Sequence, residues 1–250
     1  MKVDSMSVIR RVMLGSILPV AIIVAWYVYT TYCDVPAGIL PGIPSVCDAF
    51  IDMLQTGKLQ DDLVVSLGRV GRGFLASSVF GLVLGTFMGA SQTMRALFSP
   101  LVTAIRQIPM IAWTPLCILW FGIGEGSKIA VILLAAAFPI AMNVIGGIDS
   151  TPRHLLEVAR LYGYGRWQTF LRVQLPHALP QILTGLRIGL SISWMALIAA
   201  ELISGTSGIG YHMTNARNLI HSNEVIVCMF AVGIVGAIMD GALAALLRVL

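Results

Sequence analysis

The chain has 250 residues, of which 57% are hydrophobic and 11% are charged, and its mean hydropathy is +0.87. Because soluble domains carry about 25% charged residues, this composition excludes an ordinary soluble protein and indicates one polytopic membrane domain over residues 1–250. The net charge of +4 does not point to nucleic acid, since basic residues in a membrane protein chiefly mark cytoplasmic loops and no basic and aromatic interleaving is present.

Six apolar segments are each about twenty residues long, which is the length that crosses a bilayer as a helix. They predict an all-α fold with about six transmembrane helices, at 12–31, 67–90, 101–121, 127–148, 180–203 and 225–247. The first segment follows Arg10 and Arg11 and precedes no Ala-x-Ala cleavage site, so we expect an uncleaved span. The third contains Pro109 and Pro115, and we expect it to be bent or broken because prolines leave carbonyl groups unpaired.

Charged residues divide between the two sides of the predicted bundle. If the N-terminus, with Lys2, is cytoplasmic, then Arg95, the loop at 149–178 and Arg248 are cytoplasmic as well. The opposite side receives a group of aspartates, at positions 34, 48, 52, 61 and 62. This asymmetry follows the positive-inside rule and predicts a cytoplasmic N-terminus.

Small residues recur every four positions in the second predicted span, at Ser77, Gly81, Gly85 and Gly89. In a bilayer such a ridge lets two helix backbones approach closely. We expect the ridge to pack inside the subunit, and a contact between two copies of the chain is the alternative.

A polar, basic stretch at 150–177 interrupts the apolar sequence. Thr151 is the expected N-cap of a helix with Pro152 at its first position, and Gly163 is placed to end that helix in a left-handed turn. A second short helix is expected at about 166–174, ending before Pro176. The pattern predicts a helix–turn–helix outside the bilayer that serves as a docking element, and an ordinary amphipathic loop is the alternative.

The sequence contains few residues that could form a nucleotide-binding, catalytic or metal-binding site. Residues 122–128 read GIGEGSK, but a phosphate-binding loop needs Gly and Lys to be adjacent, so we predict a tight turn and no nucleotide site. No catalytic group of residues and no metal-ligand spacing is present. Cys117 and Cys228 are expected to be inert in the core, whereas Cys33 and Cys47 are either free thiols or a disulfide.

Intramembrane charges are costly and often functional. Arg187 and Asp240 are expected to form a structural ion pair between the fifth and sixth spans. Glu201 is a possible gate or substrate-path residue, or else a partnered acid that fixes the glycine-rich loop after it. Arg106 could attract an anion to the path, or its side chain could extend to the membrane surface.

The stretch at 150–177 resembles the cytoplasmic coupling motif of ABC importer permeases, which reads Glu-Ala-Ala, three residues, Gly, nine residues, Ile, one residue, Leu-Pro. On that spacing lie Glu157, Ala159, Gly163, Leu175 and Pro176, while Val158 replaces an alanine and Val173 the isoleucine. Further stretches resemble the permeases of the taurine, alkanesulfonate and nitrate importer family, at 40–46, 66–70, 106–109, 113–116, 119–125, 183–188, 199–203 and 207–211.

The resemblance covers most of the chain and implies a type I ABC importer permease of the inner membrane. It implies a homodimer in membrane lipid that assembles with two ATPase subunits and an extracytoplasmic binding protein and works by alternating access. The ATPase partner would bind ATP, and this chain would carry no cofactor. Relatives carry sulfonates, nitrate, bicarbonate or thiamine-pyrimidine precursors, and some take riboflavin or other aromatics; the sequence does not choose among them. The expected ATPase anchors are Leu155, Val158, Ala159 and Tyr162. The alternatives are an ion-coupled secondary transporter, which would need a titratable cluster near mid-membrane, and a non-transporting scaffold.

Overall fold

The computed structural model describes the backbone of residues 8–247 and the side chains of residues 14–247. The predicted positions of Lys2 and Arg248 lie outside these residues. The described part is helical, without strands, which confirms the all-α fold. Its elements are α1 (Val8–Tyr32), α2 (Ile43–Gln55), α3 (Lys58–Ala90), α4 (Gln92–Gln107), α5 (Met110–Phe121), α6 (Glu125–Asp149), α7 (Arg153–Leu161), α8 (Arg166–Thr169), the π-helix η1 (Phe170–Gln174), α9 (Leu175–Ser204), α10 (Ile209–Asn218) and α11 (Ser222–Leu247).

Among the described residues, five helical segments are long and apolar enough to cross a membrane, and the bent pair α4 and α5 passes the same test when its two helices are counted together. The two helices of this pair meet at an angle of 100°. The break falls at Ile108 and Pro109, whose backbones are not helical, so the prediction of a broken third span is confirmed. The predicted starts of the second and third spans were wrong, because helix α3 begins at Lys58 and α4 at Gln92. Hydropathy locates the apolar part of a helix and not its polar first turns.

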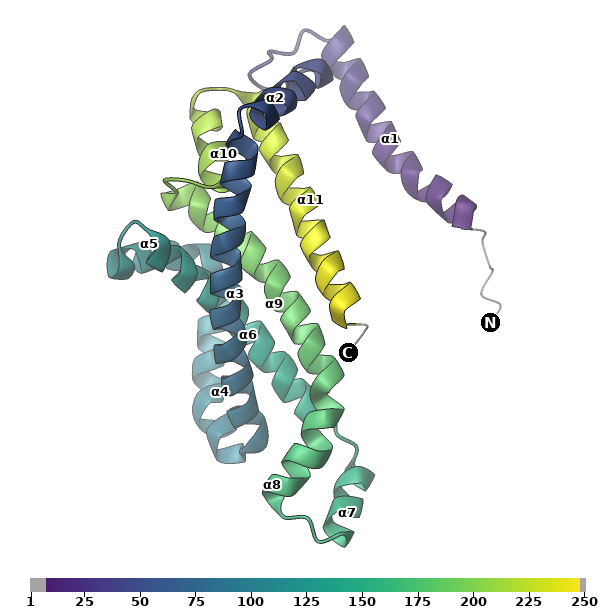
Figure 1. Ribbon diagram of the computed structural model, residues 1–250, viewed down its shortest axis with the longest axis vertical. Coiled ribbons are helices and arrows are strands. Elements are labelled where there is room, and N and C mark those ends of the chain that lie inside the picture. Colours follow the sequence, from purple (N-terminus) through teal and green to yellow (C-terminus); the bar gives the residue numbers. More distant parts are fainter. Residues whose placement is uncertain (1–7, 248–250) are drawn as a thin grey trace.

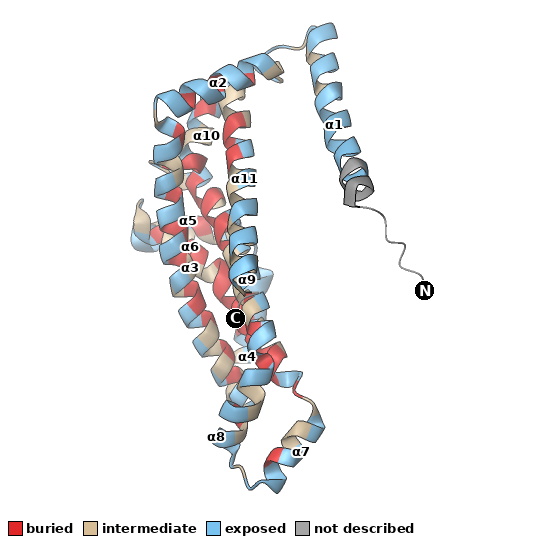
Figure 2. Cartoon of the chain, turned by 45° about the vertical axis from the view of Figure 1, so that its right-hand side comes forward, coloured by how far each residue is buried: buried red, intermediate tan, exposed pale blue. Residues whose placement is uncertain are grey.

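Helices α3, α6 and α9 form the centre of the bundle, and buried residues concentrate where they meet (Figure 2). The small residues of α3 lie against α6. A β-carbon added at Gly81 would lie 2.6 Å from the carbonyl oxygen of Ala137, and one at Gly85 would lie 2.6 Å from Cβ of Val144. The ridge therefore packs inside the subunit, as predicted, and the dimer alternative is wrong for these residues.

Helix α1 stands apart from the bundle (Figures 1 and 2), and its described side chains are mostly exposed. Near its end, the indole Nε1 of Trp26 donates a hydrogen bond to the carbonyl oxygen of Pro41 (3.1 Å). Cys33 and Cys47 are free thiols, so the disulfide alternative is wrong, and Cys117 and Cys228 are buried as predicted.

Candidate functional site

Residues 150–177, called the coupling element below, project from the end of the bundle opposite to α2 and α10 (Figure 1). The N-cap of α7 is Pro152 and not Thr151 as expected. The Thr151 hydroxyl instead donates to the carbonyl oxygen of Ile148 (2.8 Å), and the residue is buried. The predicted cap was wrong because this side chain pairs back with the last turn of α6.

Gly163 ends α7 as predicted, with a φ of 75°. Its amide donates to the carbonyl oxygen of Arg160 (2.9 Å), and the amide of Tyr164 donates to the carbonyl oxygen of Ala159 (3.0 Å). These two bonds form a Schellman motif, which needs the left-handed conformation at the glycine. The turn fixes the direction in which the chain leaves α7.

The second helix of the coupling element does not end before Pro176. Helix α8 runs into the π-helix η1 and then into α9, so Arg166–Ser204 forms one helical segment of 39 residues. A proline cannot donate to the carbonyl group four residues before it, and here Pro176 lies in the first turn of α9. Just before it, the Leu175 amide donates to the carbonyl oxygen of Phe170, one residue further back than in an α-helix. The wider turn lets the helix continue, so the expected stop was wrong.

Apolar side chains of the coupling element remain exposed. Leu161 is 87% exposed and Tyr162 is 78% exposed, and Val158 and Trp167 are exposed too. Ala159 is buried, so it packs against this chain and the expectation that it anchors a partner was wrong. The other residues predicted for coupling are Leu155 and Leu175, which are half-buried, and Glu157 and Pro176, which are exposed. Leu161 was missed although it lies three residues after Val158, a spacing that shares one helix face.

A charged cluster lies inside the bundle around Glu201. An Nη1–H of Arg69 donates to Glu201 Oε1 (2.7 Å), and Ser66 Oγ lies 3.0 Å from both carboxylate oxygens. The Gly210 amide donates to Glu201 Oε2 (3.0 Å), and Arg69 also reaches the Ser207 carbonyl oxygen (2.7 Å). The geometry matches the alternative in which Glu201 is a partnered acid that holds the following loop. Its role as a gate stays a prediction.

The same cluster extends to the start of α6. Arg69 Nη2 lies 2.7 Å from Glu125 Oε1, and Arg72 Nη2 lies 2.8 Å from Glu125 Oε2. Lys128 is 1% exposed, and its ammonium group has no hydrogen-bond partner among the described residues. The cluster thus contains three basic residues, Arg69, Arg72 and Lys128, and two acidic residues, Glu125 and Glu201. Residues 122–124 form the turn before α6, with Gly122 at a φ of 76°, and no strand precedes them in the described chain.

Arg187 and Asp240 meet as expected. Arg187 Nε donates to Asp240 Oδ1 (2.6 Å), and Nη2 donates to Oδ2 (2.5 Å). Their side chains are 46% and 37% exposed, so the pair lies on the surface of this chain and not in its interior. Arg106 lies exposed in the last turn of α4, without an ion pair among the described residues. Its proposed attraction for an anion stays a prediction.

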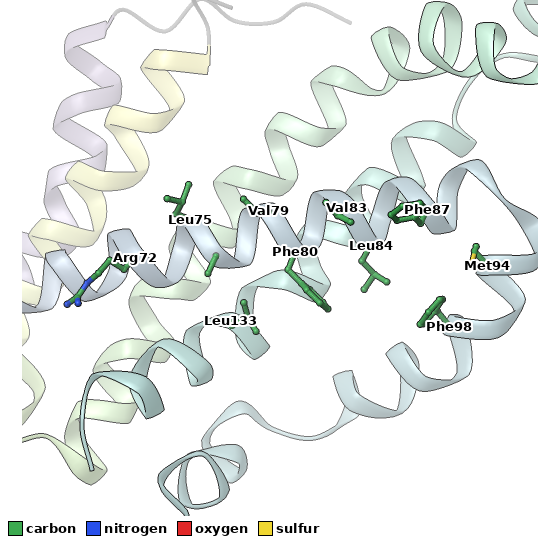
Figure 3. Close-up of a pocket in the computed structure, with 11 residues that line it drawn as sticks. Arg72, Leu75, Val79, Phe80, Val83, Leu84, Phe87, Met94, Phe98 and Leu133 are labelled. Atoms are coloured by element: carbon green, nitrogen blue, oxygen red, sulfur yellow. The ribbon is translucent and has the colours of Figure 1, made fainter. Parts of the chain in front are cut away.

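A cavity with a volume of about 990 Å³ lies beside α3, α4 and α6 and is lined mainly by apolar side chains. Figure 3 shows Phe80 and Leu84 of α3 pointing to the side from which Phe98 and Leu133 come, while Leu75 and Val79 project from the other side of the helix. Arg72, at one end, is the charged residue of this lining and is already paired with Glu125. Such a cavity suits lipid chains or apolar side chains and does not suit a polar solute.

At the end of the bundle that holds α10, His212 lies between two carboxylates. Its Nδ1 lies 2.9 Å from Asp62 Oδ2, and its Nε2 lies 3.2 Å from Glu224 Oε2. His221 contacts the other oxygen of Glu224 (3.2 Å). The hydrogen bond to Asp62 raises the pKa of His212, Glu224 adds to this increase, and partial burial opposes it.

Comparison with known proteins places this architecture in a family. Residues 77–250 match the family described as the binding-protein-dependent transport system inner membrane component. The chain belongs to this family. This chain is therefore a permease subunit. The prediction of a membrane-spanning ABC importer permease is confirmed over the alternative of an ion-coupled secondary transporter.

Several relatives match nearly the whole permease. A putative ABC transporter permease of Methanocaldococcus jannaschii is 37% identical, over 92% of this chain and 88% of the relative. The taurine transport system permease of Escherichia coli is 33% identical, over 96% of this chain and 89% of the relative. The nitrate import permease of Synechocystis is 35% identical, over 88% of this chain and 84% of the relative.

Solved structures share the fold of the permease. An inward-facing methionine ABC transporter matches with a TM-score of 0.64 at 21% identity, over 74% of this chain and 92% of that chain. An amino acid ABC transporter matches with a TM-score of 0.68 at 16% identity, over 80% of this chain and 98% of that chain. The predicted type I importer permease fold is confirmed.

Proposed function

We propose that this permease imports a small oxyanion or related organic solute, such as a sulfonate or nitrate, by alternating access. The names of its relatives support this substrate class, since they include permeases for taurine, aliphatic sulfonates and nitrate. ATP is bound and hydrolysed by a partner chain, and the permease itself needs no cofactor.

The working assembly that we propose holds two copies of the permease, two ATPase subunits and an extracytoplasmic binding protein, all within membrane lipid and without nucleic acid. The N-terminus and the coupling element face the cytoplasm. Two features leave apolar surface for lipid and for a second copy of the permease. Helix α1 leaves the bundle with its apolar side chains exposed, and the cavity beside α3 and α4 is apolar and open. Side chains of this kind need lipid or another protein surface to cover them.

The continuous helical segment Arg166–Ser204 carries the mechanistic proposal. It starts in the coupling element and contains Glu201 near its other end, so a tilt imposed at Arg166 reaches the charged cluster around Glu201 without passing through a flexible loop. A helix of that length spans roughly 60 Å at 1.5 Å per residue. Closure of the ATPase dimer would move this lever and reorient the path between the two permease copies.

Docking on the ATPase would use the exposed apolar side chains Val158, Leu161 and Tyr162. Val158 and Leu161 lie three residues apart on α7 and Tyr162 is its C-cap, as expected for a short helix that enters a groove of its partner. Glu157 and Trp167 flank them and are exposed as well.

The experiment that tests this proposal compares Leu161→Asp with Leu219→Asp. Leu219 is also exposed, but it follows α10 at the opposite end of the bundle. The permease is co-expressed with its ATPase and purified through a tag on the permease. We expect Leu161→Asp to lose the ATPase from the purified complex and Leu219→Asp to retain it. Retention of the ATPase by both variants would refute docking through α7.

A further inference from the structure

A polar cavity of about 730 Å³ separates the coupling element from the start of α4. One wall is formed by residues 90–93, which join α3 to α4, and the other by α7, α8 and η1. Two arginines of the coupling element, Arg160 and Arg166, line it. Its lining contains no acidic residue.

Both arginines lack a carboxylate partner. Neither the Arg160 side chain nor the Arg166 side chain makes a hydrogen bond or an ion pair within residues 14–247, and both are exposed. In contrast, Arg95, which lies near by in the first turn of α4, is held by Asp149 at 2.7 Å. The cavity therefore has two free guanidinium groups facing it, and each offers several N–H donors in a planar fork.

Three hydroxyl groups of the cavity are also free to donate, whereas Ser91 Oγ accepts a hydrogen bond from the Met94 amide (3.4 Å). The hydroxyl groups of Thr93, Tyr164 and Thr169 line the cavity and have no hydrogen bond in the described structure. The backbone amides of Gln92 and Thr93 begin α4, a helix of 16 residues, and are unpaired there. The N-terminus of a helix attracts anions, and here it faces two arginines across the cavity.

Tyr164 is held in place by its neighbours. The guanidinium carbon of Arg172 lies 5.4 Å from the centre of the Tyr164 ring, within the range of a cation–π contact. The amide of Tyr164 closes the Schellman motif after α7. These two contacts fix the position of Tyr164 in its wall of the cavity.

We propose that this cavity binds a tetrahedral oxyanion, a sulfate ion or a phosphate or sulfonate group, between Arg160, Arg166 and the first turn of α4. Charge-assisted hydrogen bonds from arginine to such groups are stronger than hydrogen bonds between neutral groups. The bound anion would tie the coupling element to α4 and restrain the movement of one against the other. This inference does not depend on which solute the permease transports.

The source of the oxyanion is either a free ion of the cytoplasm or the phosphate of a lipid headgroup. Both are tested on the full-length permease. Radiolabelled sulfate is titrated against the protein in a neutral detergent, and retained phosphatidylglycerol is counted by native mass spectrometry after extraction from vesicles of phosphatidylglycerol and phosphatidylcholine. Sulfate binding in detergent identifies a free ion, and selective retention of phosphatidylglycerol identifies the headgroup.

The matched variants are Arg160→Gln, Arg166→Gln and Arg153→Gln. Arg153 is exposed at the start of α7 and does not line the cavity. Loss of one charge-assisted bond weakens binding by about tenfold or more, so we expect this loss in the first two variants and less than about a twofold change in the third. A bound anion should also slow amide hydrogen exchange in residues 153–169, in the wild type and in Arg153→Gln only.

Three results would overturn the proposal. The first is equal weakening in all three variants, which would show a diffuse attraction between charges. The second is that chloride, at the same ionic strength, competes for the site as strongly as sulfate does. The third is the absence of both sulfate binding and selective lipid retention in the wild type. Size-exclusion profiles confirm that each variant is folded before it is measured.

Discussion

The guanidinium group of Arg69 and the carboxylate of Glu201 lie 2.7 Å apart, although the two residues are separated by 132 positions in the sequence. Both side chains are almost completely buried. Arg69 belongs to α3 and Glu201 to α9. Arg69 also binds Ser207 in the loop before α10, and Glu201 binds the amide of Gly210 in the first turn of α10. The pair therefore joins two spans and one loop at the end of the helical segment that begins in the coupling element.

Removing one member of this pair should destabilise the permease strongly. Breaking a buried ion pair costs about 3–5 kcal/mol, because the remaining charge stays buried without its partner. We expect Glu201→Leu and Arg69→Met each to lower the unfolding temperature and the yield of monodisperse protein, and the double variant to recover part of both.

Arg72→Met is the matched control, because Arg72 pairs with Glu125 at 2.8 Å while its side chain is mostly exposed. An exposed pair contributes about 0–1 kcal/mol. Equal losses from Arg72→Met and Arg69→Met would show that burial of the pair does not determine its contribution.

Sequence patterns predicted the spans, the broken third span and the left-handed glycine at 163, because each depends on residues close together in the chain. They did not predict the partner of Glu201. Arg69 stands before the most apolar part of its span, and nothing local indicates that it meets a carboxylate on α9. The error at Thr151 has a similar origin, since its hydroxyl pairs with the preceding helix and not with the following one. Contacts between segments decide both cases.

Gly163→Thr should uncouple ATP hydrolysis from transport while the permease stays assembled with its ATPase. A residue with a β-carbon is strained by roughly 1 kcal/mol at a φ of 75°, so the chain direction after α7 should change. Gly165→Thr is the control, because Gly165 has a φ of −69° at an N-cap position, where threonine is accepted as well as glycine. Transport and ATPase activity are measured in proteoliposomes. Normal coupling in Gly163→Thr would contradict a role for this turn.

Single cysteines at positions 58 and 166, in a cysteine-free background, should react with an impermeant maleimide from opposite sides of the membrane. Lys58 and Arg166 are both exposed and begin helices at opposite ends of the bundle (Figure 1). We expect Lys58→Cys to be labelled in intact cells or spheroplasts and Arg166→Cys only after permeabilisation. Labelling of both from the outside would overturn the proposed topology.

The stability of the permease should fall as the pH rises through the raised pKa of His212. In its charged form the ring donates from both nitrogens, to Asp62 (2.9 Å) and to Glu224 (3.2 Å). The folded pKa of His212 lies above the unfolded value, which is about 6.5. The stabilisation is therefore complete below about pH 6.5 and is lost as the pH rises through the folded pKa.

The measurement is the unfolding temperature in detergent between about pH 6 and pH 8.5, a window that begins near the unfolded pKa of histidine. His212→Gln should flatten this dependence. His221→Gln should keep it, because among the described residues the His221 side chain pairs with Glu224 alone, and it is more exposed than that of His212. An unchanged slope in His212→Gln would assign the dependence to another group.

The pair of Arg187 and Asp240 should stabilise the permease through its position in the membrane and not through burial in the subunit. The two side chains bond through two contacts, of 2.6 Å and 2.5 Å, on the spans α9 and α11. Either charge alone would face lipid or a second copy of the chain, where it is unfavourable. Arg187→Ala and Asp240→Ala should therefore each lower the yield of monodisperse protein severalfold, and the double variant should recover most of it. Arg95→Ala is the control, because Arg95 and Asp149 are similarly exposed and 2.7 Å apart but lie at helix ends, where water can reach an unpaired charge. Additive losses in the double variant would show that Arg187 and Asp240 do not stabilise each other, and Arg187 would then be tested for a contact with solute or with a lipid headgroup.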